Sequence, residues 1–244
     1  DLGQDLAAEQ VARPRIFKSH QRLSSINRGG RYLCLVRRVE DVLLSWWNFL
    51  RPKDIPPLHK YGSASDFAFD EGFFARGMRF GASIWEYYVE FFQARRLHNV
   101  LVLCYEDLLE DLEGHLAVIA GFLGLPADHI AEPSAVAAIL QLCSREGMAS
   151  MASRFDESWT FEELKRVGRM QDPSSFAPTP RVNAQQRPED REALTEAAAQ
   201  FLRDRWRDEV FDKVGLHSYE ELREAVRAEV EARRQQLPPA RSSA

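Results

Sequence analysis

The chain has 244 residues, of which 45% are hydrophobic, and this is enough to bury the core of one domain. Its 37 aspartates and glutamates outnumber its 32 lysines and arginines, so the net charge is −5. Nucleic-acid-binding proteins usually carry a basic surplus, and this balance argues against broad nucleic-acid binding. It leaves room for a local basic pocket that binds one small anion.

The three cysteines show no metal-ligand spacing. Cys34 and Cys104 lie inside apolar runs, which favours buried free thiols in a reducing compartment over a disulfide or a zinc site. No apolar run approaches the roughly 20 residues that a membrane span needs. We therefore expect a cytoplasmic protein that has no membrane segment. Because the chain begins at Asp1, an N-terminal targeting segment is not excluded by its sequence.

Three short apolar runs predict the buried strands of a parallel sheet, at residues 15–17, 31–36 and 99–105. Helical patterns lie between and after them, at residues 39–50, 81–96, 109–125 and 188–211. This alternation predicts an α/β fold in three layers, with a parallel sheet flanked by helices. We expect one domain over residues 1–228, and a fraying helix with a disordered tail over residues 229–244.

Functional side chains follow each predicted strand. Lys18 and His20 follow the first strand, Arg37 the second and Tyr105 the third. Ligands of open α/β sheets bind outside the carboxyl ends of the strands, so we expect these side chains to share one edge. Ser45 lies about two turns into the helix after Arg37. Arg37 and Ser45 could therefore hold one anion together.

Each of these residues also has an ordinary structural explanation. A lysine or histidine at a strand end is usually solvated, and Arg37 or Arg38 could simply pair with Glu40 or Asp41. Ser45 could be a small residue inside a helix, and Tyr105 could complete the hydrophobic core. Their combination at equivalent positions of three strands favours a binding site.

Three blocks of the chain, "PRIFKSH", "YLCLVRRVEDVLLSWWNF" and the run that begins "WEYYVEFFQARR" and ends "IAGFLGL", resemble the PAPS-dependent sulfotransferases. PAPS is 3′-phosphoadenosine-5′-phosphosulfate. Members of that family carry a K-[ST]-H strand end, then R-x-P-x-D-x-x-x-S and then Y-E-D-L-x-x-D. The resemblance covers residues 13–125. Its specific parts are the interval from Arg37 to Ser45 and the run of Tyr105, Glu106 and Asp107 with Asp111.

The resemblance implies a P-loop NTPase-like fold and transfer of a sulfuryl group from PAPS to a hydroxyl or amine of a small acceptor, without a metal. His20 would be the general base, and Lys18 would stabilise charge on the sulfuryl group. Arg37 and Ser45 would hold the 3′-phosphate, and Tyr105 would lie against the adenine. These roles suit the chemistry, because sulfuryl transfer resembles phosphoryl transfer and depends on positioning and charge stabilisation. Histidine titrates near neutrality, and arginine matches a phosphate with a planar fork.

The chain departs from the family pattern in three places. Arg38 and Val39 stand where the family has Asn-Pro. The signature R-K-G-x-x-G-D-W is absent, and "FAPTPRVN" occupies about its place, so Arg181 is a candidate for the same contact with the 3′-phosphate. No phosphate loop P-K-[ST]-G-[ST]-[ST]-W is found, since "HKYGSAS" at residues 59–65 does not follow an apolar strand.

We therefore expect the chain to lack the first strand, loop and helix of the family. That loop would supply the backbone donors and the lysine that cradle the 5′-phosphosulfate. Without it, the 244-residue chain should be inactive on its own. It should also expose an unpaired hydrophobic strand edge.

The sequence specifies neither the acceptor nor the oligomeric state. Phe73, Phe74 or Phe80 could line an apolar pocket, which suggests an apolar alcohol or phenol as the acceptor. One alternative is a non-catalytic module that binds 3′-phosphoadenosine nucleotides, because the sulfate cradle is missing. Another is a P-loop kinase relative. It is disfavoured because no acidic residue stands where a magnesium-bound nucleotide would need one at a strand end, although Asp107 just after Tyr105 keeps it open. Metal dependence of the reaction would separate the kinase from the sulfotransferase.

Overall fold

The computed structural model describes residues 9–10, 13–52, 56–75, 82–126, 130, 132–154, 162–163, 165–168 and 193–237. Its central element is a pair of parallel strands, β1 (Tyr32–Val36) and β2 (Val100–Cys104). Tyr32 lies opposite Val100 and Val36 opposite Cys104, so the two strands end level with each other. The second and third predicted strands are confirmed to within one residue at each end.

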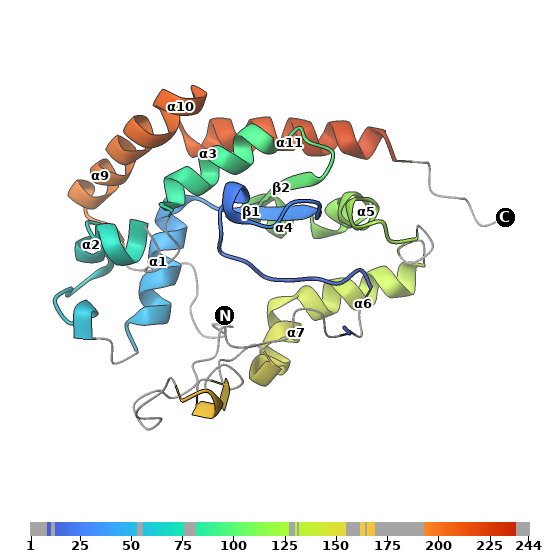
Figure 1. The fold of residues 1–244 in the computed structure, drawn as a ribbon, viewed down its shortest axis with the longest axis horizontal. Helices are drawn as coiled ribbons and strands as arrows, with labels where there is room; N and C mark the ends of the chain where they lie inside the picture. The colour runs from blue at the N-terminus through green and yellow to red at the C-terminus, as the bar shows by residue number, and fades with distance from the viewer. Residues whose placement is uncertain are drawn as a thin grey trace.

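Helices surround the two strands (Figure 1). In this view α3 (Ile84–Ala94) and α11 (Tyr219–Gln235) run together above the strands, and α6 (Pro133–Cys143) and α7 (Arg145–Ser150) lie below. The other α-helices are α1 (Val39–Leu50), α2 (Ala64–Phe67), α4 (Tyr105–Glu110), α5 (Leu112–Leu123), α9 (Glu196–Trp206) and α10 (Asp212–Val214). Shorter 3₁₀ and π segments are η1 (Leu23–Ser25), η2 (Pro56–Leu58), η3 (Glu71–Ala75), η5 (Ala152–Arg154) and η8 (Arg207–Phe211). This parallel sheet flanked by helices confirms the predicted fold class.

Local sequence signals set several helix ends. α3 begins with a capping box, in which Ser83 Oγ accepts from the Glu86 N–H and the Ser83 N–H donates to the Glu86 carboxylate. Asp111 caps α5 by accepting from the Gly114 N–H at 2.8 Å. That helix ends at Gly124, whose φ of 73° is left-handed and suits glycine.

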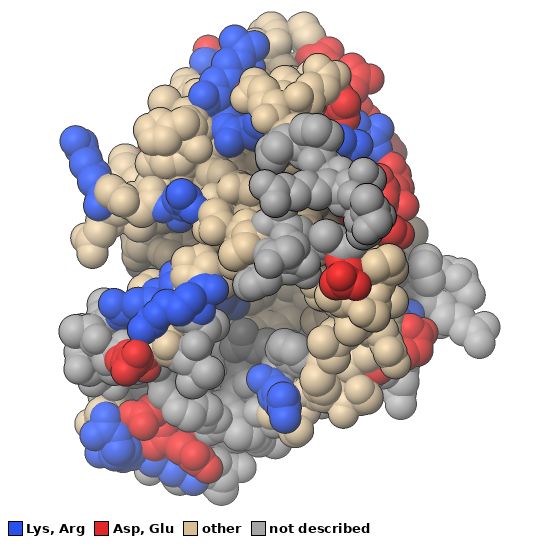
Figure 2. Space-filling view, turned by 90° about the vertical axis from the view of Figure 1, so that its right-hand side faces the viewer, with Lys and Arg blue, Asp and Glu red and all other residues tan. Residues whose placement is uncertain are grey.

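On the face shown in Figure 2, the lysine and arginine side chains of the described residues form separate patches, with acidic and uncharged side chains between them. This mixture agrees with the small net charge of the sequence. In the described part of the chain, no helix is both long and apolar enough to cross a lipid bilayer.

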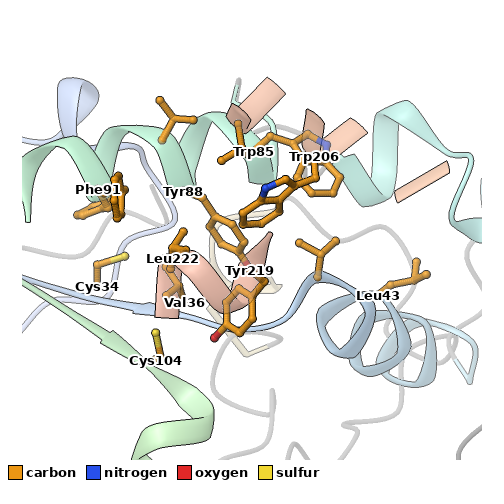
Figure 3. Close-up of a cluster of buried hydrophobic side chains, with 14 of the residues drawn as sticks. Cys34, Val36, Leu43, Trp85, Tyr88, Phe91, Cys104, Trp206, Tyr219 and Leu222 are labelled. Atoms are coloured by element: carbon orange, nitrogen blue, oxygen red, sulfur yellow. The ribbon is translucent and has the colours of Figure 1, made fainter. Parts of the chain in front are cut away.

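An aromatic cluster joins α3, α9 and α11 in the core (Figure 3). The Trp206 ring packs edge-on against Trp85, Tyr88 and Tyr219, with ring centroids 6.3–6.4 Å apart. The Trp206 indole N–H donates to the Leu216 carbonyl at 2.9 Å, so its polar atom is satisfied. The cluster fixes the two helices above the strands relative to each other.

The cysteines behave as the sequence predicts. Cys34 in β1 and Cys104 at the end of β2 are buried free thiols, and Cys143 is exposed. Burial raises the pKa of both buried thiols to about 12. They therefore stay protonated and act as small apolar side chains.

The first predicted strand is not formed. Residues 15–17 have irregular backbone, and the Ile16 and Phe17 side chains are 62% and 54% exposed. The Ile16 N–H donates to Gln10 Oε1, and the Gln10 side-chain amide donates to the Ile16 carbonyl. A side-chain amide thus takes the backbone bonds that a neighbouring strand would have taken. Here the prediction was wrong.

β1 leaves one face uncovered. Cys34 and Val36 are buried, whereas the alternating Leu33 and Leu35 are each 44% exposed. β2, by contrast, is buried along its whole length.

At the C-terminus, α11 continues past residue 229, where we expected the helix to fray. Val230 is only 5% exposed, and the Arg233 guanidinium donates to the Val100 carbonyl at 2.8 Å. The helix is therefore packed against the sheet up to this point. Residues 238–244 lie outside the described residues.

α1 is held by its buried side, and this predicts the effect of truncating one leucine. Leu43 in α1 is 0% exposed, so Leu43→Ala should lower the free energy of unfolding by about 2–5 kcal/mol through lost burial and a cavity. Leu142 in α6 is 53% exposed, and Leu142→Ala should change it by no more than about 0.5 kcal/mol. Urea unfolding of both variants measures the difference. Equal losses would contradict the packing of α1.

Candidate functional site

The structure brings Arg37 and Tyr105 together at one edge of the sheet. Each follows directly after the last residue of a strand, and these last residues, Val36 and Cys104, are partners in the register. The Arg37 guanidinium carbon lies 4.5 Å from the centroid of the Tyr105 ring, which is a cation–π distance. The predicted convergence of these two side chains is confirmed.

Arg37 has hydrogen-bonding capacity left over. Its one ion pair within the described residues joins Nη2 to Asp41 Oδ1 over 3.9 Å, at the outer limit for such a contact. Its Nε is buried and has no hydrogen-bond partner there. An unpaired buried donor costs free energy unless a ligand satisfies it, and a cation would be satisfied best by an anion.

Ser45 lies in α1, one turn beyond Asp41 on the same face of the helix. Asp41 contacts Arg37 at the strand end, so Ser45 lies one turn further from the strand end than Asp41 on this face of α1. Ser45 is exposed, so its hydroxyl is accessible to a ligand.

Lys18 and His20 lie on an exposed, irregular segment and not at the end of a strand, so that part of the prediction was wrong. The chain just after His20 is attached to α3. The Ser24 N–H and hydroxyl both donate to the Glu90 carboxylate, and Arg22 pairs with Glu86 at 3.5 Å. These contacts fix where the segment ends.

Arg181 lies outside the described residues, as do Phe80 and the side chain of Phe73. Phe74 is 5% exposed and packs against Phe67 in the core, with ring centroids 6.0 Å apart. A pocket of about 260 Å³ is not lined by Phe74. Its lining residues are Trp47, Arg51, Leu58, His59, Tyr61 and Gly62.

The sequence analysis named Glu106 as part of the family motif but gave it no role in the site. One of its carboxylate oxygens accepts from the backbone N–H of Arg38 at 3.0 Å, and the other accepts from the Tyr219 hydroxyl. On the other strand end, the Tyr88 hydroxyl donates to the Arg37 carbonyl. Glu106, the residue after Tyr105, is therefore bonded to the backbone of Arg38, the residue after Arg37. An acidic residue two positions after the last residue of a buried strand was the available signal.

Known proteins resemble this chain over much of its length. Cytosolic sulfotransferase 14 of Arabidopsis thaliana is 29% identical over 175 residues, which are 66% of this chain and 49% of that protein. Sulfotransferase 1A1 of Rattus norvegicus is 29% identical over 121 residues, 48% of this chain and 40% of that protein. The chain thus spans about half the length, or less, of these curated relatives.

The crystal structure of mouse sulfotransferase SULT7A1 complexed with PAP aligns with a TM-score of 0.53 at 17% sequence identity. The alignment covers 83% of this chain and 62% of that one, and it shows a common fold. The model of the sulfotransferase domain family matches residues 4–209, which is most of the chain. The protein therefore belongs to the PAPS-dependent sulfotransferase family.

Proposed function

We propose that this protein transfers a sulfuryl group from PAPS to a hydroxyl or amine of a small acceptor, for which an apolar alcohol or phenol is the leading candidate. The observation that carries the proposal is the Arg37 guanidinium against the Tyr105 ring at the common end of two parallel strands. In a sulfotransferase, these side chains suit the two ends of a 3′-phosphoadenosine group.

The residues present fit the nucleotide. Arg37 offers a buried Nε without a partner in the described residues, which suits the 3′-phosphate. Ser45 adds an accessible hydroxyl donor from α1. Tyr105 is half-buried and presents an aromatic face on which adenine can stack. We assign Arg181 to the same 3′-phosphate from the later part of the chain.

In the proposed reaction His20 takes the proton of the acceptor group while the acceptor oxygen or nitrogen bonds to sulfur. The bond from sulfur to the 5′-phosphate oxygen breaks, and 3′-phosphoadenosine-5′-phosphate leaves with that electron pair. The Lys18 ammonium offsets negative charge on the sulfuryl oxygens. A neutral imidazole is available near pH 7, which is the condition for a general base.

The site of action is also a proposal. The relative from Arabidopsis thaliana is named a cytosolic sulfotransferase. This name and the reduced, buried cysteines support a cytoplasmic enzyme.

The direct test of the function uses PAPS labelled in its sulfuryl group and a panel of phenols, alcohols and amines. With the full product of the gene, label should pass to at least one acceptor without added divalent metal, and chelator should not stop the reaction. Binding of 3′-phosphoadenosine-5′-phosphate without transfer to any acceptor would favour the non-catalytic nucleotide-binding module. Strict dependence on magnesium would favour the kinase relative.

Arg37→Ala should weaken binding of 3′-phosphoadenosine-5′-phosphate about ten- to a hundredfold, because it removes a charge-assisted bond to the 3′-phosphate. Binding of adenosine-5′-phosphate, which lacks that group, should change little. Titration calorimetry with both nucleotides measures the two affinities. Arg207→Ala is the matched control, since this exposed guanidinium pairs with Asp204 and Asp208. Equal losses for the two nucleotides would remove Arg37 from the 3′-phosphate site.

His20→Ala should lower turnover to less than a few per cent of the wild-type rate and leave nucleotide affinity nearly unchanged, because the base acts on the acceptor proton. His98→Ala is the control, as His98 is exposed and lies just before β2, at the opposite end of the sheet. Rates are compared in the full product of the gene with the best acceptor found. If both variants keep wild-type turnover, His20 is not the base.

A further inference from the structure

The helix α11 makes the buried ionic contacts of the turn that carries Tyr105. The Asp107 carboxylate is 4% exposed and accepts from Arg223 Nε at 2.6 Å and from Arg227 Nε at 2.7 Å. Both arginines also donate to Glu110, and the bond from Arg223 lowers the pKa of that carboxyl group. A buried carboxylate needs such partners, because a lone buried charge is strongly unfavourable.

The first residue of the same helix reaches the neighbouring carboxylate. The Tyr219 hydroxyl donates to Glu106, whose other oxygen accepts the Arg38 N–H. Burial raises the pKa of Tyr219, so its hydroxyl stays protonated and remains a donor. Packing against Trp206 leaves the Tyr219 side chain 5% exposed, and Figure 3 shows its ring in the aromatic cluster.

These contacts form one connected path. Tyr219 holds Glu106, which holds the backbone of Arg38, and Arg223 holds Asp107 in the same turn. Arg37 and Tyr105 are the residues just before Arg38 and Glu106, and their side chains lie against each other. The spacing of these two side chains therefore depends on where α11 puts two carboxylates.

The helix α11 lies beyond the region that the family model matches. The matched region ends at Glu209, and α11 begins at Tyr219. The helix is nevertheless tied to the strand-end turn by buried and charge-assisted bonds, which are the stronger class of hydrogen bond.

We propose that α11 positions the nucleotide site, and that Tyr219 and Arg223 are its positioning residues. By holding Glu106 and Asp107, they set the Tyr105 ring against the Arg37 guanidinium before any ligand arrives. A preorganised pair binds more tightly because the ligand does not have to order it. The identity of the ligand as a 3′-phosphoadenosine nucleotide rests on the proposed function, whereas the positioning itself does not.

The test compares Tyr219→Phe and Arg223→Gln with two matched controls. Tyr219→Phe removes one hydroxyl and keeps the ring, and Arg223→Gln leaves Asp107 its bond from Arg227. The control Tyr32→Phe loses a hydroxyl that bonds the Asn27 carbonyl near the start of β1. The control Arg234→Gln changes the same helix where it bonds the Gly114 carbonyl.

The first readout needs no ligand. The Arg37 Nε–H resonance of the ¹⁵N-labelled chain reports the ring current of Tyr105, and it should shift in Tyr219→Phe and Arg223→Gln and stay in place in both controls. The second readout is the affinity for 3′-phosphoadenosine-5′-phosphate by calorimetry, which should fall about tenfold in each test variant. In an Arg37→Ala background, Tyr219→Phe should add little, because the two changes affect one contact.

The two proposals fail in distinguishable ways. If Tyr219→Phe lowers the thermal midpoint but leaves both the Arg37 resonance and the nucleotide affinity unchanged, α11 only stabilises the fold, and the positioning role is overturned. If the resonance shifts as expected while the wild type binds no 3′-phosphoadenosine-5′-phosphate, the positioning stands and the proposed function fails. Should Arg223→Gln not fold, Tyr219→Phe decides by itself.

Discussion

Two parallel strands point their carboxyl ends the same way, so the residues that leave them meet at one edge. Here the register sets Val36 opposite Cys104, and the next residues, Arg37 and Tyr105, come within cation–π distance. The other residues of the candidate site lie on the helices that begin next to this pair. α1 starts after one strand and presents Ser45, and α4 starts after the other and presents Glu106 and Asp107.

The carboxylates at this edge of the sheet have hydrogen-bond partners, as polar groups close to the core need. Asp107 has two guanidinium partners, and Glu106 has a backbone and a phenol partner. Arg37 Nε stands out from them, since it is buried and has no partner among the described residues. Unsatisfied buried donors are uncommon in folded proteins, and a bound anion would satisfy this one.

Hydrophobic pattern was sufficient to predict much of this fold. The apolar runs at residues 31–36 and 99–105 agree with the observed strands to within one residue at each end, and the twelve-residue amphipathic pattern of α1 agrees with its helix, because burial decides them. The rule that ligands bind at the carboxyl ends of parallel strands was then sufficient to predict that Arg37 and Tyr105 meet. The run at residues 15–17 predicted a strand that is not formed, because its two apolar residues show no period and the Gln10 amide bonds the backbone of Ile16. The role of α11 was not predictable either. Arginines four residues apart, such as Arg223 and Arg227, look like a solvated helix face until the fold brings Asp107 to them.

The separation in sequence between α11 and the turn that it contacts has a consequence during synthesis. Tyr219 and Glu106 are 113 residues apart, and Arg223 and Asp107 are 116 apart. Ribosomes add about 5–20 residues per second, so both strands leave the exit tunnel several seconds before the helix that completes their turn. During that interval the carboxylates of the nascent turn remain hydrated, and the chain has to close a long loop before they can be buried. The release of α11 from the exit tunnel therefore sets the earliest time at which this turn can take its final geometry.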